Sequence, residues 1–165
     1  MAYRVKVVIN NDQKAVKVPK GMRMLVRRCC NAVLQLENFD GCAEIGITFT
    51  DNEGIRKLNK QYHDSDTEID AISFPKGDKN IYTTDTDTNT KFLGDVVISM
   101  EKAEFQSAVL GHSLQREIGY LTAHGVLQLF GYNYTGAMNK VRMREKEEWT
   151  LEQLGFAPSS SYALN

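Results

Sequence analysis

The sequence predicts a mixed fold class, α/β or α+β, in which helices pack on a small sheet. Short apolar or alternating segments typical of strands recur along the chain, at residues 4–10, 43–50 and 93–100 among others. Segments with apolar residues at helical spacing separate and follow them. The 165 residues suffice for one domain with a buried core, and we expect residues 1–155 to form it and residues 156–165 to be a tail.

The first part of the chain alternates strand, helix, strand and helix. Residues 4–10 predict an opening strand, because apolar side chains occupy every second position. After Gly21, apolar residues recur at helical spacing, namely Leu25, Cys29, Ala32, Val33 and Leu36. A second strand covers residues 43–50, and either Thr50 or Asp51 can cap the helix that follows it.

The middle of the chain combines a short strand with a polar segment. Residues 70–75 predict an apolar strand that ends at a proline, and residues 76–91 predict a solvated surface loop. Acidic and amide residues from Asp85 onward resemble the start of a calcium loop. Thr90 stands where such a loop needs glycine and Val96 where it needs glutamate, so a calcium site is disfavoured.

The last part of the chain is predicted to be a strand followed by three helices. Residues 93–100 form the strand. The first helix ends at Gly111, and Ser113 caps the second, which ends at Gly131. The third helix spans residues 137–154.

Composition and charge exclude several classes. Lys+Arg 20 against Asp+Glu 21 leaves no overall field that would attract nucleic acid, although a local basic patch remains open. No apolar run is long enough to span a membrane, and the N-terminus lacks an apolar signal core. Three cysteines without C-x-x-C spacing favour a reducing cytoplasm, and Cys29 and Cys30 are expected to be core thiols.

The stretch TAHGVLQLFGYNYTG, residues 122–136, carries the chemistry of most interest. His124 and Gln128 share a helix face, and the turn at Gly131 lets Tyr134 fold back toward it. Three histidines at these positions would bind zinc and leave a fourth position for water. An amide and a protonated phenol are weak zinc partners. On these residues alone, a satisfied core histidine is favoured over a metal ligand.

Other polar residues have plainer interpretations. We expect Arg116 and Glu117 to form a buried pair that holds helices together, and Glu147 to belong to an i, i+4 ladder of charges rather than reach the metal side. A basic run on the last helix predicts a solvated face more strongly than an RNA contact, and it comprises Lys140, Arg142, Arg144 and Lys146.

Several motifs together resemble one family. HGVLQLFGYNY resembles H-G-x-L-H-L-x-G-Y-D-H, which is typical of the YbeY family of metal-dependent endoribonucleases. Residues 58–75, 93–99 and 111–121 are similar to further family segments. The last helix matches the family spacing at Met143, Glu147, Leu151 and Gly155. The resemblance covers roughly residues 43–155.

The resemblance implies an α+β metallohydrolase fold, a small mixed sheet packed with helices. It implies a zinc-dependent endoribonuclease specific for single strands, with RNA and the ribosome as partners. Its expected role is maturation of ribosomal RNA, notably the 3′ end of the small-subunit RNA, and ribosome quality control in the cytoplasm.

Matched residue by residue, the chemistry departs from the family pattern. His124 matches the first metal ligand, whereas Gln128 and Tyr134 stand where the second and third ligand histidines belong. Asn133 replaces the neighbouring aspartate, and His63 replaces an arginine of the substrate cleft. We therefore expect weak or absent zinc binding and a catalytic activity that is lost or strongly impaired.

Two alternatives remain open at the sequence level. The chain is either a non-catalytic protein that binds RNA or the ribosome, with Arg116, Lys140 and Arg144 as candidate RNA contacts, or an active enzyme with a rebuilt site. A rebuilt site would draw on His63, Tyr134 or a carboxylate such as Glu117, and it is the less favoured alternative.

Overall fold

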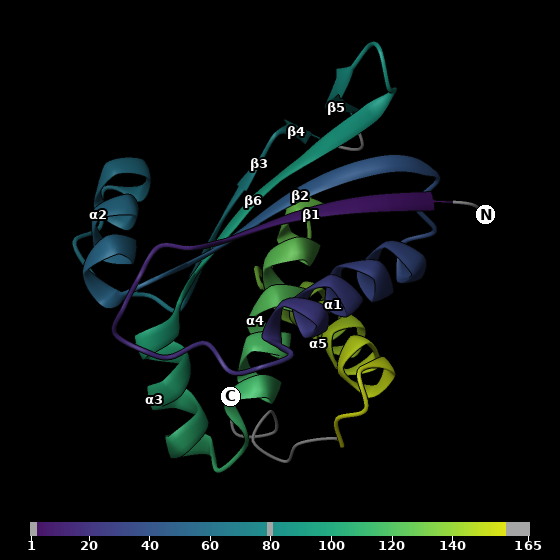
Figure 1. Ribbon diagram of the computed structural model, residues 1–165. Helices are drawn as coiled ribbons and strands as arrows, with labels where there is room; N and C mark the ends of the chain where they lie inside the picture. The colour runs from purple at the N-terminus through teal and green to yellow at the C-terminus, as the bar shows by residue number, and fades with distance from the viewer. Residues whose placement is uncertain (1–2, 79–80, 158–165) are drawn as a thin grey trace.

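A computed structural model describes residues 3–78 and 81–157 and shows an α+β fold, a mixed sheet with helices on both faces (Figure 1). Its strands are β1 (Tyr3–Asn11), β2 (Gly41–Thr50), β3 (Ala71–Pro75), β4 (Gly77–Asp78), β5 (Ile81–Asp85) and β6 (Thr90–Ser99). Its helices are α1 (Met22–Leu36), α2 (Asn52–His63), α3 (Met100–Leu110), α4 (Leu114–Leu129) and α5 (Ala137–Gln153). The α+β class is therefore confirmed.

The sheet combines parallel and antiparallel pairing around β6. Strands β1, β2 and β6 run parallel. Both β3 and β5 pair antiparallel with β6, with β3 beside residues 94–98 and β5 beside residues 90–92. The register shifts opposite Gly94, whose φ is 140°, and a Cβ there would lie 2.3 Å from the Phe74 carbonyl oxygen. Only glycine fits this bulge, so the last residues of β3 can pair closely with β6.

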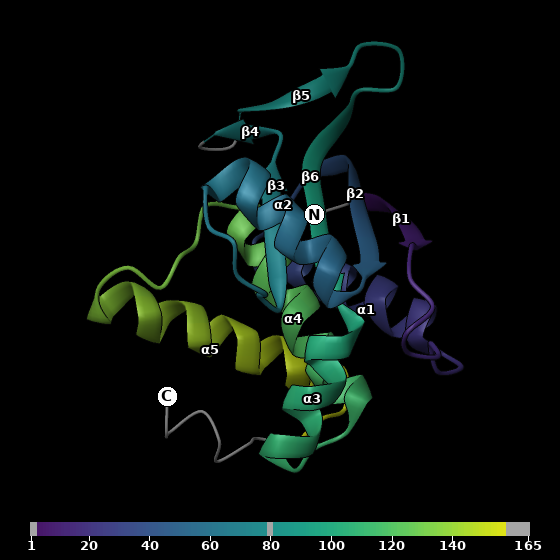
Figure 2. The same ribbon diagram turned by 90° about the vertical axis from the view of Figure 1, so that its left-hand side faces the viewer.

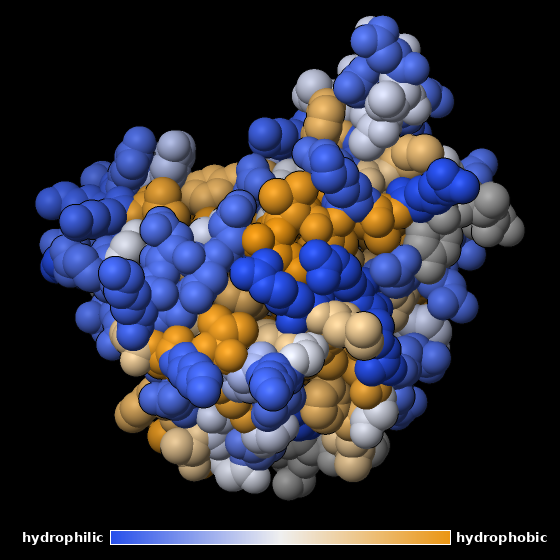
Figure 3. Space-filling model, in the orientation of Figure 1, coloured by the Kyte–Doolittle hydropathy of each residue, from blue (hydrophilic) through white to orange (hydrophobic). Residues whose placement is uncertain are grey.

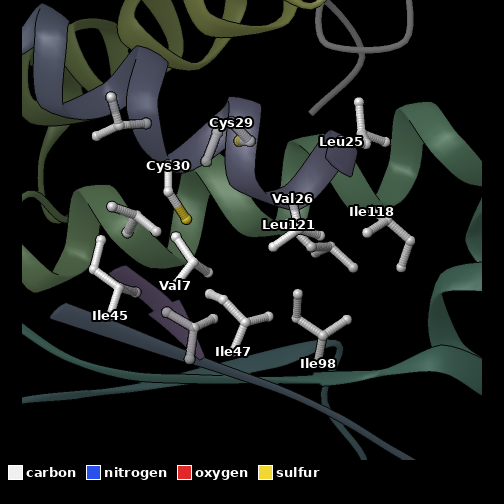
Figure 4. Close-up of a cluster of buried hydrophobic side chains, with 14 of the residues drawn as sticks. Val7, Leu25, Val26, Cys29, Cys30, Ile45, Ile47, Ile98, Ile118 and Leu121 are labelled. Atoms are coloured by element: carbon white, nitrogen blue, oxygen red, sulfur yellow. The ribbon is translucent and has the colours of Figure 1, made fainter. Parts of the chain in front are cut away.

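The two faces of the sheet carry separate apolar clusters. Figure 4 shows Ile45, Ile47 and Ile98 of the sheet pointing toward Val26 of α1 and Leu121 of α4. On the opposite face α2 packs near β3, as Figure 2 shows, with a smaller cluster formed by Ile55, Ile72 and Val97. Successive strand residues point to opposite faces, which explains why Val97 and Ile98 belong to different clusters.

The helix boundaries follow the capping residues that the sequence predicts. Asp51, rather than Thr50, caps α2 and accepts a hydrogen bond from the Gly54 amide at 2.8 Å. Ser113 caps α4 through the Arg116 amide at 3.1 Å. Gly111 ends α3 with a φ of 73°, a conformation that glycine adopts at little steric cost.

The outward face of α1 is hydrophilic, as its amphipathic pattern predicts. Arg23, Arg27 and Arg28 are exposed on it, and Figure 3 shows hydrophilic side chains over α1 beside an apolar patch over β1. On the inward side Cys29 and Cys30 are fully buried, so the prediction of core thiols is confirmed. No helix in the described part of the chain is long and apolar enough to cross a membrane.

The prediction of a structureless loop over residues 76–91 was wrong. The segment contains β4 and β5, and β5 extends the sheet beside β6. Its Ile-Tyr-Thr-Thr run is rich in residues that favour strands, a signal that its overall polarity masks. At the turn that follows, the Asp85 carboxylate accepts a hydrogen bond from the Asp87 amide at 2.8 Å. Residues 79–80 of the predicted loop lie outside the described residues.

The start of the predicted tail contacts the domain. Phe156 packs against the main core, and the Ala157 carbonyl accepts a hydrogen bond of 3.3 Å from Arg116. The remainder, residues 158–165, lies outside the described residues.

Candidate functional site

The site begins with the close packing of α4 on the sheet. A Cβ at Gly125 would lie 2.4 Å from a methyl carbon of Val96, so glycine is needed for α4 to approach β6. The Ser73 hydroxyl also donates a hydrogen bond of 3.0 Å to the Gly125 carbonyl. This packing fixes the neighbouring residue His124 on the side of α4 that faces α5.

A buried glutamate holds the imidazole of His124. The Nδ1 atom of His124 donates to Oε2 of Glu147 on α5 at 2.6 Å, and Glu147 is 1% exposed. With Nδ1 protonated, the neutral ring carries its lone pair on Nε2. A carboxylate that fixes the tautomer in this way is typical of the partners that orient metal-binding histidines.

The expectation that Glu147 joins a surface ladder of charges was wrong. Met143, Thr150 and Leu151 on the same side of α5 are all buried. A glutamate at this spacing must face the interior, which was the sequence signal that could have identified it. Glu147 instead connects α5 to the histidine of α4.

Tyr134 completes this cluster. Its hydroxyl donates to the second oxygen of Glu147, Oε1, and lies 3.2 Å from the Tyr120 hydroxyl. The rings of His124 and Tyr134 have centroids 4.9 Å apart. The chain therefore folds back after Gly131, as its turn predicts. We call His124, Glu147, Tyr134 and Tyr120 the histidine cluster.

The electrostatics of the cluster keep the phenol protonated. Burial and the neighbouring Glu147 carboxylate raise the pKa of Tyr134 above its usual range. The Arg144 guanidinium lies 5.5 Å from the centre of the Tyr134 ring and acts in the opposite direction, with a smaller effect. At neutral pH Tyr134 is thus a hydrogen-bond donor and not a phenolate ligand.

Gln128 and His63 line a different feature, a hollow of about 350 Å³ between the ends of α2 and α4. Its walls are formed by Asn59, His63, Ile69, Ala71, Ile72, Ser73, Pro75, Gln128 and Tyr132. Among the described residues, the Gln128 amide has no hydrogen-bond partner. The structure therefore brings Tyr134 to His124, whereas Gln128 and His63 line the same hollow.

The position that replaces the family aspartate shapes the turn. Asn133 is exposed, and its side-chain oxygen accepts a hydrogen bond of 2.9 Å from the Thr135 amide. This is an Asx turn, which holds the backbone that returns Tyr134 to the histidine cluster.

Arg116 and Glu117 are both buried, but each has its own partners. The Arg116 guanidinium lies 3.6 Å from Glu148, whereas Glu117 accepts hydrogen bonds from His112 at 2.6 Å and Gln106 at 2.8 Å. The predicted pairing between the two was wrong, because neighbouring residues on a helix point in different directions. Arg116, a candidate RNA contact, is 5% exposed.

The basic run on α5 divides between surface and interior contacts. Arg142 is exposed and Lys140 is half-buried. Lys146 lies 2.8 Å from Glu37 and 5.0 Å from the centre of the Tyr132 ring. The prediction of a uniformly solvated face was therefore wrong for Lys146 and for Arg144, which lies over Tyr134.

The donors at the family's ligand positions do not fit zinc. One imidazole, an amide and a protonated phenol lie where zinc takes histidine, cysteine or carboxylate. In residues 3–78 and 81–157, no group of three or more such side chains is positioned to hold a metal. Glu117, proposed for a rebuilt site, is occupied by His112 and Gln106.

Comparison with known proteins assigns the chain to a family. The model of the family Endoribonuclease YbeY matches residues 8–155, so the chain belongs to that family. The family assignment made from the sequence motifs is confirmed.

Relatives agree with this assignment, and one solved structure shares the fold. Endoribonuclease YbeY of Desulforamulus reducens is 38% identical over 149 residues, which cover 90% of this chain and 97% of the relative. Endoribonuclease YbeY of Caldanaerobacter subterraneus subsp. tengcongensis is 39% identical and covers 92% of this chain and 98% of its own. The solution structure of TM1509 from Thermotoga maritima shares the fold, with a TM-score of 0.61, 17% identity, and coverage of 90% and 89%.

Proposed function

We propose that this chain acts on ribosomal RNA as other members of its family do, but that its metal-dependent cleavage is lost or strongly impaired. One observation carries the proposal. At the position of the third ligand, the Tyr134 hydroxyl donates to Glu147, the same carboxylate that holds His124. The group that would complete a metal site is thus hydrogen-bonded to the residue that orients the first ligand.

The chemistry of cleavage explains why this matters. Hydrolysis by this class depends on a metal that lowers the pKa of a bound water, and that metal needs several strong ligands. At the three family ligand positions this chain offers a single imidazole, that of His124, and Gln128 lines the hollow. His63 also replaces an arginine, which would hold a phosphate through two parallel hydrogen bonds.

The alternative on the same fold is a protein that binds RNA or the ribosome in the cytoplasm without cleaving it. Two basic residues of α5 support it, the exposed Arg142 and the half-buried Lys140, because they lie on the helix that carries Glu147 of the histidine cluster. The expected target is the 3′ end of the small-subunit RNA, in maturation or quality control. Binding that weakens with salt would reflect contacts to phosphates.

The test combines cleavage and binding on single-stranded RNA from the small-subunit 3′ end. We expect the purified chain to bind this RNA at low salt and to leave it intact, with or without added zinc. The Desulforamulus reducens relative serves as the positive control for cleavage. Cleavage by the unaltered chain that a chelator abolishes would contradict the proposal, and absence of binding at low salt would contradict its RNA-binding part.

A further inference from the structure

We propose that the hollow between α2 and α4 takes one nucleobase of single-stranded RNA, and that the Gln128 amide reads the edge of that base. The inference rests on the proposed function, because it assumes that the chain binds RNA. It assigns to Gln128 a role of its own, as a specificity-determining residue instead of a lost metal ligand.

The hollow has the size and lining of a ligand site. Its volume of about 350 Å³ lies within the usual range for small-molecule pockets. Apolar walls come from Ile69, Ala71, Ile72 and Pro75. A flat, largely apolar ring with polar edges matches such a lining, because apolar contacts bind its faces and a few polar groups fix its orientation.

Gln128 and His63 are the polar side chains of the hollow that remain available. The Ser73 hydroxyl is already used by the Gly125 carbonyl, and the Asn59 amide donates to the Thr67 carbonyl at 3.2 Å. In contrast, the described residues provide no hydrogen-bond partner for the amide of Gln128 or the imidazole of His63. An amide that lines a hollow with both its donor and its acceptor unused is suited to a ligand that presents both.

A nucleobase edge presents such a pair. The glutamine side chain offers an N–H donor and a C=O acceptor side by side. It can bind adenine through N6 and N7 at once, an arrangement worth about 1–3 kcal/mol of discrimination against the wrong base. The geometry of Gln128 therefore points to adenine as the preferred base.

Two aromatic rings at the end of α2 provide surfaces for stacking. His63 is exposed at the rim of the hollow. Tyr62, the preceding residue, is 57% exposed and packs edge-on against Phe74 with ring centroids 4.9 Å apart. Unpaired RNA bases stack on such rings, which supplies affinity that depends little on sequence. We thus assign affinity to His63 and Tyr62, and base choice to Gln128.

The experiment measures binding of four fluorescent homopolymers, oligo-A, -C, -G and -U, of about ten nucleotides. We expect the unaltered protein to prefer oligo-A by about tenfold or more, the equivalent of about 1.4 kcal/mol. Gln128→Leu keeps the apolar volume but lacks the amide, so its preference falls to within about twofold while its mean affinity stays similar. His63→Ala weakens binding of all four oligomers.

A matched control and a second variant keep the result interpretable. Gln115→Leu makes the same change at an exposed position of α4 away from the hollow and retains the preference. If Gln128→Leu fails to fold, Gln128→Glu provides the test, because a carboxylate lacks the N–H donor that binds adenine N7, so the preference for oligo-A is lost.

The outcomes separate this inference from the proposed function. Equal binding of all four oligomers, unchanged in Gln128→Leu, contradicts the base-reading role while RNA binding stands. No binding to any oligomer at low salt contradicts the proposed function itself. If Gln128→Leu keeps the oligo-A preference, Gln128 does not read the base, and the inference is wrong.

Discussion

Two buried histidine–glutamate pairs lie at α4, and they have the same separation. The Nε2 atom of His112 lies 2.6 Å from Glu117, and the Nδ1 atom of His124 lies 2.6 Å from Glu147. Both carboxylates are almost completely buried. Distance and burial therefore do not distinguish the pair that ties α3 to α4 from the pair in the histidine cluster.

The surroundings of the two pairs do distinguish them. The other oxygen of Glu117 accepts from Gln106 on α3, so this pair ties two helices together, and the buried Nδ1 atom of His112 has no partner among the described residues. The other oxygen of Glu147 accepts from Tyr134, whose hydroxyl also meets Tyr120. The second pair is thus surrounded by two phenol hydroxyls, those of Tyr134 and Tyr120, which can form hydrogen bonds.

The largest expected effect comes from removing the carboxylate of the histidine cluster. Glu147→Ala leaves His124 Nδ1 and the Tyr134 hydroxyl without their acceptor in a buried setting, so we expect a loss of about 3 kcal/mol of unfolding free energy. Urea denaturation measures it, with the exposed Glu145→Ala as the control. A loss no greater than that of the control would show that the cluster does not stabilise the fold.

Removing the carboxylate of the His112–Glu117 pair is expected to cost less stability. Glu117→Ala also removes an acceptor of two hydrogen bonds, but the half-buried Gln106 can turn to solvent, so we expect about 2 kcal/mol. The exposed Glu104→Ala is the control. RNA binding should stay unchanged once the variant is folded, and reduced binding would mean that this pair is not purely structural.

Removing the phenol hydroxyl tests the link between Tyr134 and Glu147 alone. Tyr134→Phe keeps the ring against His124 and deletes one hydrogen bond to a buried carboxylate, so we expect a loss of about 1–2 kcal/mol. Equilibrium unfolding measures the effect, and Tyr62→Phe, at an exposed ring, is the control. An unchanged stability would mean that Glu147 needs only His124.

The smallest effect is a change in the pH dependence of stability. The folded-state pKa of Tyr134 lies above the unfolded value of about 10, so its contribution is complete below that pH and is lost as the pH rises beyond it. Tyr134→Phe should therefore lose less stability than the unaltered chain between about pH 9 and about pH 11. Identical slopes for the two proteins would contradict the raised pKa.

The comparison also shows what the sequence can and cannot reveal. Apolar spacing and capping residues such as Asp51 and Ser113 predict most helices and strands, because local physics determines them. The β5 strand was missed, since the polar residues around its Ile-Tyr-Thr-Thr run mask the strand preference and its pairing with β6 lies outside the local pattern. Tertiary pairing is not visible in local pattern.

Some features of the candidate site could likewise be predicted from the sequence, and others could not. The turn at Gly131 predicts that Tyr134 returns to His124, and the structure shows the contact. The role of Glu147 was missed because i, i+4 charge spacing was given more weight than its buried face, and the placement of Gln128 and His63 around the same hollow depends on how α2 and α4 pack across β3. Such meetings of distant segments require the folded structure.

The most direct test of the central claim is the zinc content of the protein after purification without added metal and extensive dialysis. We expect no tightly bound zinc in the chain as it stands. The double variant Gln128→His, Tyr134→His, which restores imidazoles at the three family ligand positions, should retain roughly one zinc per chain. If the unaltered chain already retains one zinc that resists dialysis, the histidine cluster is a working metal site and the account is wrong.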